Sequence, residues 1–212
     1  MIDMKRCGEV VRTTKETDIS VKVDIDGKGR ADIDTGIGFF DHMLTALSVH
    51  SGISMTIKVK GDLYVDCHHT IEDTGIALGQ ALGQALGAKS GIVRYGTAYI
   101  PMDESLAMAS LDLSNRPFLV FNCEFTNQSC GQYDLCMTEE FFRAFAFNSG
   151  MTLHINMLYG SNDHHKAEAV YKAVAHALKT AVTLNSDGST LSTKEFFDDS
   201  DNRLRRRKYF QR

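Results

Sequence analysis

Two adjacent histidines followed by a glutamate occur twice in the chain. The first copy, HHTIE, contains His68, His69 and Glu72, and the second, HHKAE, contains His164, His165 and Glu168. Successive residues of an α-helix are about 100° apart, so the first histidine of each copy shares a helix face with the glutamate, and the second histidine points elsewhere. Imidazole nitrogens and carboxylate oxygens suit Mn, Fe or Zn. Each copy therefore offers ligands to two metal ions.

A single pair of adjacent histidines is more often a surface or capping feature of a helix start. The repetition of the pair favours metal binding instead. Two further histidines can supply the remaining ligands, His42 in FDHML and His154 in TLHIN. His154 alternates in phase with the polar residues of its predicted strand, whereas a core histidine would alternate with the apolar ones. His50 and His176 are weaker candidates: His176 is expected at a packed or rim position, and His50 as a helix cap or at the edge of the site.

These histidines and glutamates divide evenly into two metal sites with three histidines and one glutamate each. One predicted set is His42, His68, Glu72 and His165, and the other is His69, His154, His164 and Glu168. The exchange of His69 and His165 between the two sets is the least constrained part of this prediction. Because His69 points away from His68, it could also complete a site on a neighbouring subunit, which would couple metal binding to assembly.

Hydrophobic periodicity predicts two halves with the same order of elements. Alternating apolar residues predict strands, and apolar residues three and four apart predict helices. In the first half the predicted strands are 19–25, 30–34 and 53–59, and the predicted helices are 38–50 and 68–86. In the second half the predicted strands are 105–113, 118–125 and 151–158, and the predicted helices are 137–150 and 163–182. Residues 30–34 and 118–125 are expected to be hairpin partners of the strands that precede them.

Both halves follow the order strand, strand, helix, strand, helix, which indicates an internal duplication. With a boundary near residues 88–98, we expect the halves over 1–92 and 93–194, followed by a flexible tail over 195–212. Each half is expected to be an α+β unit, a sheet covered on one face by two helices.

Composition and charge narrow the class of protein. The chain has 212 residues, 43% of them hydrophobic, and a net charge of -4. This balance is typical of a globular protein and does not favour nucleic acid as a partner. The basic run near the C-terminus is expected to be solvated, with contact to an acidic surface as the alternative.

Cysteine use and the absence of targeting patterns suggest a location. Five cysteines without a CxxC pair fit a reducing compartment. The sequence has no signal-peptide pattern and no apolar run of about 18 residues, so no membrane contact is expected. We expect a cytoplasmic protein, or a protein of the plastid stroma if a transit peptide has been removed.

From about residue 9 to residue 194 the sequence resembles the imidazoleglycerol-phosphate dehydratase family of histidine biosynthesis. The resemblance is carried by RTTKETDISV, GIGFFDHML, DCHHTIEDTGIALGQAL, GIVRYGTAYIPMDESLA, LDLSNRP, EEFFRAFAFNSGMTLHI, DHHKAEA and LSTK. After LSTK the sequence departs from the family pattern, because Glu195 stands where a glycine is usual, and this concerns the terminal loop. The length leaves no room for an appended phosphatase domain, so the monofunctional form is expected.

The resemblance implies a fold, an assembly and a reaction. The fold would consist of two halves like domain 2 of ribosomal protein S5, and the assembly would be a cubic homo-oligomer, a 24-mer, with two Mn ions per site between subunits. The reaction would remove water from D-erythro-imidazole-glycerol phosphate to give imidazole-acetol phosphate. In the mechanism of the family, the imidazole ring is held between the metals as an imidazolate, and the hydroxyl group leaves through a diazafulvene-like intermediate.

The resemblance also implies roles for individual residues. The matching substrate contacts are Glu16, Arg94, Arg116, Ser192, Thr193 and Lys194, together with the metal ligands His42, His68 and His164. Cationic and hydroxyl donors of this kind suit a phosphate monoester. The expected catalytic residues are Glu16, Glu72 and Glu168. Glu16 is the leading acid–base group, because a carboxylate near two cations can exchange a proton, and Asp103 and Glu104 are further candidates to assist it.

Two other functions would use the same ligands. A metal-storage or structural shell would bind metal without needing the phosphate-binding residues, and a metallohydrolase would use a metal-bound hydroxide. The product separates the three functions, because the dehydratase makes a ketone, the hydrolase releases phosphate and the shell does neither.

Overall fold

The computed structural model describes residues 5–186 and residue 191. The predicted substrate contacts Ser192, Thr193 and Lys194 and the predicted tail over 195–212 lie outside the described residues. None of the helices in the described part of the chain has both the length and the apolar character that a membrane span requires.

The first half forms a four-stranded sheet and two helices. Its elements are β1 (Cys7–Thr13), β2 (Thr17–Asp24), β3 (Ala31–Asp34), α1 (Gly38–Ser51), β4 (Ser54–Gly61) and α2 (His68–Leu86). The strand order across the sheet is β1-β2-β4-β3. Along β2, Ile19, Val21 and Val23 are buried and the residues between them face outward, so this alternation turns one apolar face of the sheet towards the helices.

The second half repeats this plan. Its elements are β5 (Tyr95–Met102), β6 (Ser105–Asp112), β7 (Phe118–Asn122), β8 (Ser129–Cys130), β9 (Tyr133–Asp134), α3 (Met137–Ser149), β10 (Thr152–Tyr159) and α4 (Asp163–Ala181). The strand order is β5-β6-β10-β7, which matches the first sheet, and the short β8–β9 hairpin is an addition before α3.

The predicted duplication is confirmed, but the predicted strand pairing is wrong. Each half begins with a strand that was not predicted, and these strands, β1 and β5, are the hairpin partners of β2 and β6. The strands β3 and β7, expected to form those hairpins, instead pair in parallel with β4 and β10. The reason is the helix that follows each of them, because a helical crossover returns the chain to lie parallel to the strand it left.

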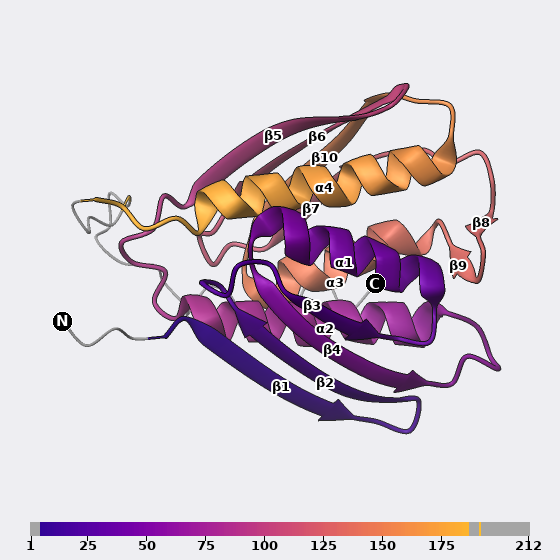
Figure 1. The fold of residues 1–212 in the computed structure, drawn as a ribbon, viewed down its shortest axis with the longest axis horizontal. Coiled ribbons are helices and arrows are strands. Elements are labelled where there is room, and N and C mark those ends of the chain that lie inside the picture. The colour runs from indigo at the N-terminus through magenta and orange to yellow at the C-terminus, as the bar shows by residue number, and fades with distance from the viewer. Residues whose placement is uncertain (1–4, 187–190, 192–212) are drawn as a thin grey trace.

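The four helices lie in a layer between the two sheets (Figure 1). Within each half a helix covers its own sheet, α2 on β1 and β2, and α4 on β5 and β6. The halves meet through α1 against α4 and α2 against α3. The approach of α2 to α3 is close, because a Cβ atom placed on Gly75 would lie 2.8 Å from the carbonyl oxygen of Phe141. The helices α1, α2 and α4 begin at the same end of this layer, at the right of Figure 1.

Candidate active site

His42 of α1 and His164 and Glu168 of α4 form one group of ligand atoms. The Nε2 atom of His42 lies 3.6 Å from Oε2 of Glu168, and the Nε2 atom of His164 lies 3.4 Å from the same oxygen. The three ligand atoms lie within 4.8 Å of one another. The packing of α1 on α4 creates the group, and the ring of Phe39 in α1 meets the His164 ring edge-on, with centroids 5.0 Å apart.

The carboxylate of Glu168 is buried and is held by Lys172. The Nζ atom of Lys172 lies 2.6 Å from Oε1 of Glu168, which leaves Oε2 facing the two histidines. Burial by itself would raise the pKa of Glu168, but the hydrogen bond and charge of Lys172 and the nearby imidazoles outweigh it, and the pKa is lowered. Glu168 is therefore ionised at neutral pH, as a metal ligand must be.

The donor set of this group fits a divalent transition-metal ion. Two imidazole nitrogens and one carboxylate oxygen suit Mn, Fe or Zn, whereas Mg and Ca prefer oxygen ligands alone. Within residues 5–186 and 191, this is the only group of three His, Cys, Asp or Glu ligand atoms that lie so close together. One chain would thus supply three ligands to an ion held here, and a substrate or another chain could supply the rest.

His68 and Glu72 form an incomplete second group at the start of α2. The Nε2 atom of His68 lies 3.3 Å from Oε2 of Glu72, which confirms that the two residues share a helix face. No third ligand joins them among the residues the structure describes. A metal ion at this pair would need further ligands from outside the described chain.

The second histidine of each motif contacts carboxylates instead. The Nδ1 atom of His69 lies 3.0 and 3.2 Å from the two carboxylate oxygens of Asp62, and its Nε2 atom lies 3.7 Å from Oε1 of Glu16. These contacts raise the pKa of His69, chiefly through the hydrogen bond with Asp62. Glu16 lies in the turn between β1 and β2, so the chain brings this predicted acid–base group beside a predicted ligand.

His165 repeats the arrangement in the second half. Its Nδ1 atom lies 2.7 Å from Oε2 of Glu104, and its Nε2 atom lies 3.7 Å from Oδ2 of Asp103. The hydrogen bond with Glu104 raises the pKa of His165 and lowers that of Glu104. Both carboxylates belong to the turn between β5 and β6, so the second half also sets a hairpin turn against its second histidine.

A single chain does not bring together either of the two predicted ligand sets. His42 lies with His164 and Glu168, not with His68 and Glu72, because α1 packs against α4 while α2 packs against α3. His154 joins neither group: its side chain is exposed on the outward face of the sheet, since its neighbours Leu153 and Ile155 point inward to the core.

The arginines expected to bind phosphate meet at one carboxylate. The Nε atom of Arg94 lies 2.6 Å from Oδ1 of Asp112, and an Nη atom of Arg116 lies 3.3 Å from Oδ2. The hydrogen bond with Asp112 raises the pKa of Arg94. Arg94 also donates a hydrogen bond to the carbonyl oxygen of Leu191, the residue before the predicted contact Ser192. The structure therefore brings together two predicted phosphate contacts and Leu191.

The arginine group at Asp112 and Glu104, the partner of His165, lie at opposite ends of β6. Strand β6 runs from Ser105, beside Glu104, to Asp112. Seven residue steps of about 3.3 Å place these two ends about 23 Å apart. His154 pairs with Ser110 of β6, so its backbone also lies towards the arginine end. No single small substrate can bridge these residues within one chain.

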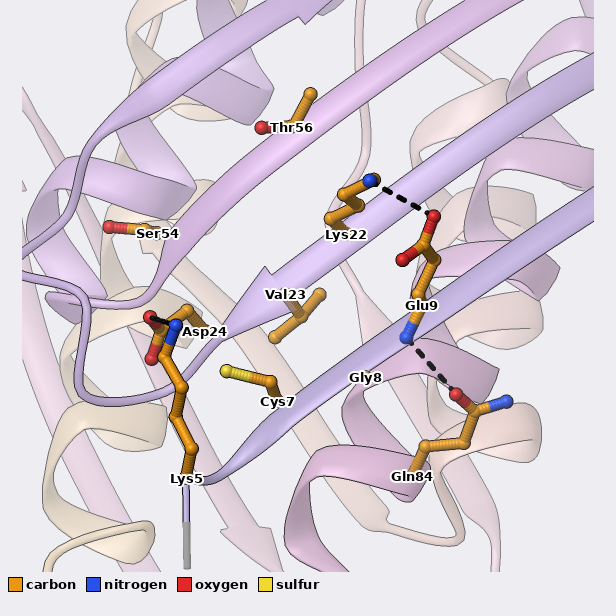
Figure 2. Close-up of a pocket in the computed structure, with 10 residues that line it drawn as sticks. All are labelled: Lys5, Cys7, Gly8, Glu9, Lys22, Val23, Asp24, Ser54, Thr56 and Gln84. Carbon is orange, nitrogen blue, oxygen red and sulfur yellow. Dashed lines mark hydrogen bonds and ion pairs between the residues drawn. The ribbon is translucent and has the colours of Figure 1, made fainter.

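Two hollows lie near the described elements. One, of about 130 Å³, lies between α2 and α3 and is lined by Glu72, Ile76, Arg143 and Phe147 among others, so it adjoins the His68–Glu72 pair. The other, of about 450 Å³, lies on the outward face of the first sheet (Figure 2). Its two lysines are paired with Glu9 and Asp24, as the dashed lines in Figure 2 mark, and it contains no predicted site residue.

The sequence patterns did not predict the contacts of Asp62 and Lys172. Lys172 follows Glu168 by four residues, and this helical spacing could have indicated the ion pair. Asp62 precedes its histidine across an irregular loop, and no periodic pattern could have indicated the contact.

Comparison with known proteins decides the family. The family model for imidazoleglycerol-phosphate dehydratase matches residues 35–178. The chain belongs to the imidazoleglycerol-phosphate dehydratase family. The curated dehydratase of Clostridium kluyveri is 55% identical over 190 residues, which cover 89% of this chain and 98% of the relative. That of Ruminiclostridium cellulolyticum is 57% identical over the same length and shares of each chain.

Solved dehydratase structures share the fold. The crystal structure from Staphylococcus aureus matches with a TM-score of 0.77 and 41% sequence identity, and the match covers 84% of this chain and 99% of that one. The structure from Pyrococcus furiosus in complex with (S)-C348 matches with a TM-score of 0.77 and 36% identity, over 88% of this chain and 99% of that one. The mixed α+β fold with two similar halves is therefore that of the dehydratase family.

Proposed function

We propose that this chain acts as an imidazoleglycerol-phosphate dehydratase, a hydro-lyase of histidine biosynthesis. The observation that carries the proposal is the His42–His164–Glu168 group, whose donor atoms fit a transition metal in a chain of this family. The substrate would be D-erythro-imidazole-glycerol phosphate, and the products imidazole-acetol phosphate and water.

The metal ligands of the proposal are those predicted from the sequence. They are His42, His68, His69, Glu72, His154, His164, His165 and Glu168. Two Mn ions per active site are proposed, although Fe and Zn accept the same donors. When bound, such ions would stabilise negative charge on the imidazole ring of the substrate.

The chain's own residues would bind the substrate and move its protons. Glu16 has a half-exposed carboxylate beside His69 and is the proposed acid–base group. Glu72 and Glu168 would hold the ions and so act at the reacting ring. Arg94 and Arg116, with Ser192, Thr193 and Lys194 of the undescribed segment, would bind the phosphate.

The active site would be shared between subunits of a homo-oligomer. The support is the separation of about 23 Å between the ends of β6 and the outward position of His154, which one substrate cannot span within a chain. A neighbouring chain could bring its arginine end to the histidine end of this one. The proposed homo-oligomer is a 24-mer. Each chain would have two halves like domain 2 of ribosomal protein S5, over residues 1–92 and 93–194.

A cytoplasmic location is the last part of the proposal. All five cysteines are unpaired in the structure, which supports a reducing compartment.

The reaction product tests the proposed activity. Mn-loaded protein incubated with imidazole-glycerol phosphate should give imidazole-acetol phosphate without release of inorganic phosphate. Released phosphate would instead indicate a metallohydrolase, and an unchanged substrate would indicate a non-catalytic shell.

Mixed oligomers test the shared site. The His164→Ala and Arg116→Ala variants should each be inactive. When equal amounts are co-assembled, about a quarter of the shared sites should receive an intact histidine end from one variant and an intact arginine end from the other, so about a quarter of the wild-type activity should return. Co-assembly of two different variants at the histidine end, His164→Ala and Glu168→Ala, is the matched control and should restore none. A lack of recovery in the first mixture would contradict a site shared between chains.

A further inference from the structure

Both second histidines use Nδ1 to contact a carboxylate, although the carboxylates come from different places. Asp62 is the first residue after β4, and the equivalent position after β10 is Gly160, which has no side chain to offer. Glu104 lies in the turn between β5 and β6 instead. The duplication therefore did not copy the residue, yet the same contact exists in both halves. The recurrence indicates that each histidine needs a carboxylate at Nδ1, whichever backbone segment supplies it.

The contact determines which ring nitrogen carries the proton. A neutral imidazole has one N–H and one lone pair, and an ionised carboxylate can only accept a hydrogen bond. The carboxylate therefore places the proton on Nδ1 and leaves the lone pair on Nε2. The Nε2 atoms of His69 and His165 each lie 3.7 Å from a carboxylate oxygen, beyond hydrogen-bond distance, and within residues 5–186 and 191 neither makes a hydrogen bond.

The two carboxylate residues are anchored independently of the histidines, Asp62 through its backbone and Glu104 through its side chain. The backbone N–H of Asp62 donates to the carbonyl oxygen of Glu16 at 3.0 Å, which ties the loop after β4 to the first hairpin turn. The second oxygen of Glu104 accepts from the backbone N–H groups of Asn162 at 2.7 Å and Ser161 at 3.1 Å. Asn162 in turn caps α4 by accepting from the N–H groups of His164 and His165. A carboxylate on an anchored residue can fix the orientation of the imidazole ring that it contacts.

We propose that Asp62 and Glu104 are positioning residues that orient His69 and His165, so that Nε2 of each is presented as a metal ligand. The proposal rests on the metal-dependent function above. It adds two residues that would not touch the ion or the substrate and would act only through the rings they hold. Outer carboxylates of this kind typically contribute 10- to 100-fold to metal affinity.

Mn(II) titration of chelator-treated protein tests the proposal, with isothermal calorimetry as the readout. Asp62→Ala and Glu104→Ala should each weaken Mn(II) binding by about 10- to 100-fold. Asp62→Asn and Glu104→Gln should lose less, because an amide oxygen still accepts from Nδ1–H. Asp66→Asn is the matched control: Asp66 lies in the same loop and accepts a hydrogen bond from the backbone N–H of His68, and within the described residues it makes no hydrogen bond with the His69 ring, so this change should lower the affinity far less.

Thermal unfolding of the metal-free proteins separates positioning from folding. The proposal expects melting temperatures close to wild type for the Asn and Gln variants. Wild-type Mn(II) affinity in both alanine variants would overturn it, as would equal losses in the alanine and amide variants accompanied by a lower metal-free melting temperature. Failure of the proposed function has a different result: the wild-type protein itself would then bind no Mn(II). If the wild type binds Mn(II) and the variants bind it equally well, only the positioning role of Asp62 and Glu104 fails.

Discussion

The Nδ1 atom of His50 lies 3.3 Å from the Nε2 atom of His176, and this contact joins α1 of the first half to α4 of the second. Both rings are partly buried, with centroids 5.4 Å apart. Lys172 and Lys179 of α4 add positive charge near His50, and Glu168 adds the opposing negative charge. Burial, followed by Lys172 and His176, lowers the pKa of His50 below 6.5. The His50–His176 contact is thus part of the interface between the halves.

This pair predicts a loss of stability in acid. Because the folded-state pKa of His50 is depressed, the unfolded chain binds more protons between that pKa and 6.5. The contribution of the neutral ring is fully present above 6.5 and is lost as the pH falls towards the folded-state pKa. We expect His50→Asn to lose less unfolding free energy than wild type between about pH 7 and pH 5, measured by urea denaturation. His69 and His165 have raised pKa values and act in the opposite direction, but they are present in both proteins and cancel in the comparison. Equal losses in the two proteins would contradict the role of His50.

Removal of a ligand imidazole should remove metal. His42→Ala deletes one of the three clustered donor atoms, so we expect elemental analysis to find less metal per chain than in the wild type. We also expect activity to fall at least tenfold, which corresponds to an activation free energy higher by roughly 1.4 kcal/mol. His176→Ala is the control, since it removes a partly buried imidazole from the same helix interface without touching the cluster. Wild-type metal content in His42→Ala would count against the cluster as a metal site.

A change at Glu16 should separate chemistry from metal binding. Glu16→Gln keeps the shape of the side chain but removes its ability to exchange a proton, so we expect turnover to fall by about 100-fold or more while metal content stays at the wild-type level. The measurements are steady-state kinetics and elemental analysis of the same preparation. Metal loss in this variant would indicate that Glu16 serves the metal site and not the proton transfer.

Three glycines of α2 should respond differently to alanine. A Cβ atom would lie 2.8 Å from the Phe141 carbonyl oxygen at Gly75 and 2.7 Å from that of Phe145 at Gly79, whereas at Gly83 the nearest atom is 3.6 Å away. We expect the first two substitutions to destabilise the protein by about 1 to 3 kcal/mol through overpacking of α2 on α3. Gly83→Ala should stabilise it by up to about 1 kcal/mol through helix propensity. Thermal or urea unfolding measures the stabilities of the three variants. A destabilised Gly83→Ala variant would show that the distance between α2 and α3 does not decide the effect of alanine at these positions.

Much of the fold and the chemistry could be predicted from local patterns. The i,i+4 spacing of His68 with Glu72 and of His164 with Glu168 guarantees a shared face on any α-helix, and the structure confirms both pairs. Alternation along the strands and the repeated motifs indicated two α+β halves, because periodicity reflects which face of an element is buried. These properties depend only on residues close in sequence.

Tertiary packing decided what those patterns left open. Two contacts join elements that lie far apart in the chain. His42 of α1 meets His164 and Glu168 of α4, and Arg94 and Arg116 meet at Asp112. The parallel pairing of β3 and β7 likewise depends on how a helix crosses the sheet. By itself, the sequence determined the kinds of ligand and their spacing along each helix. Only the tertiary structure decided which helices touch, because that choice depends on the fit of whole faces such as the glycine-lined contact of α2 with α3.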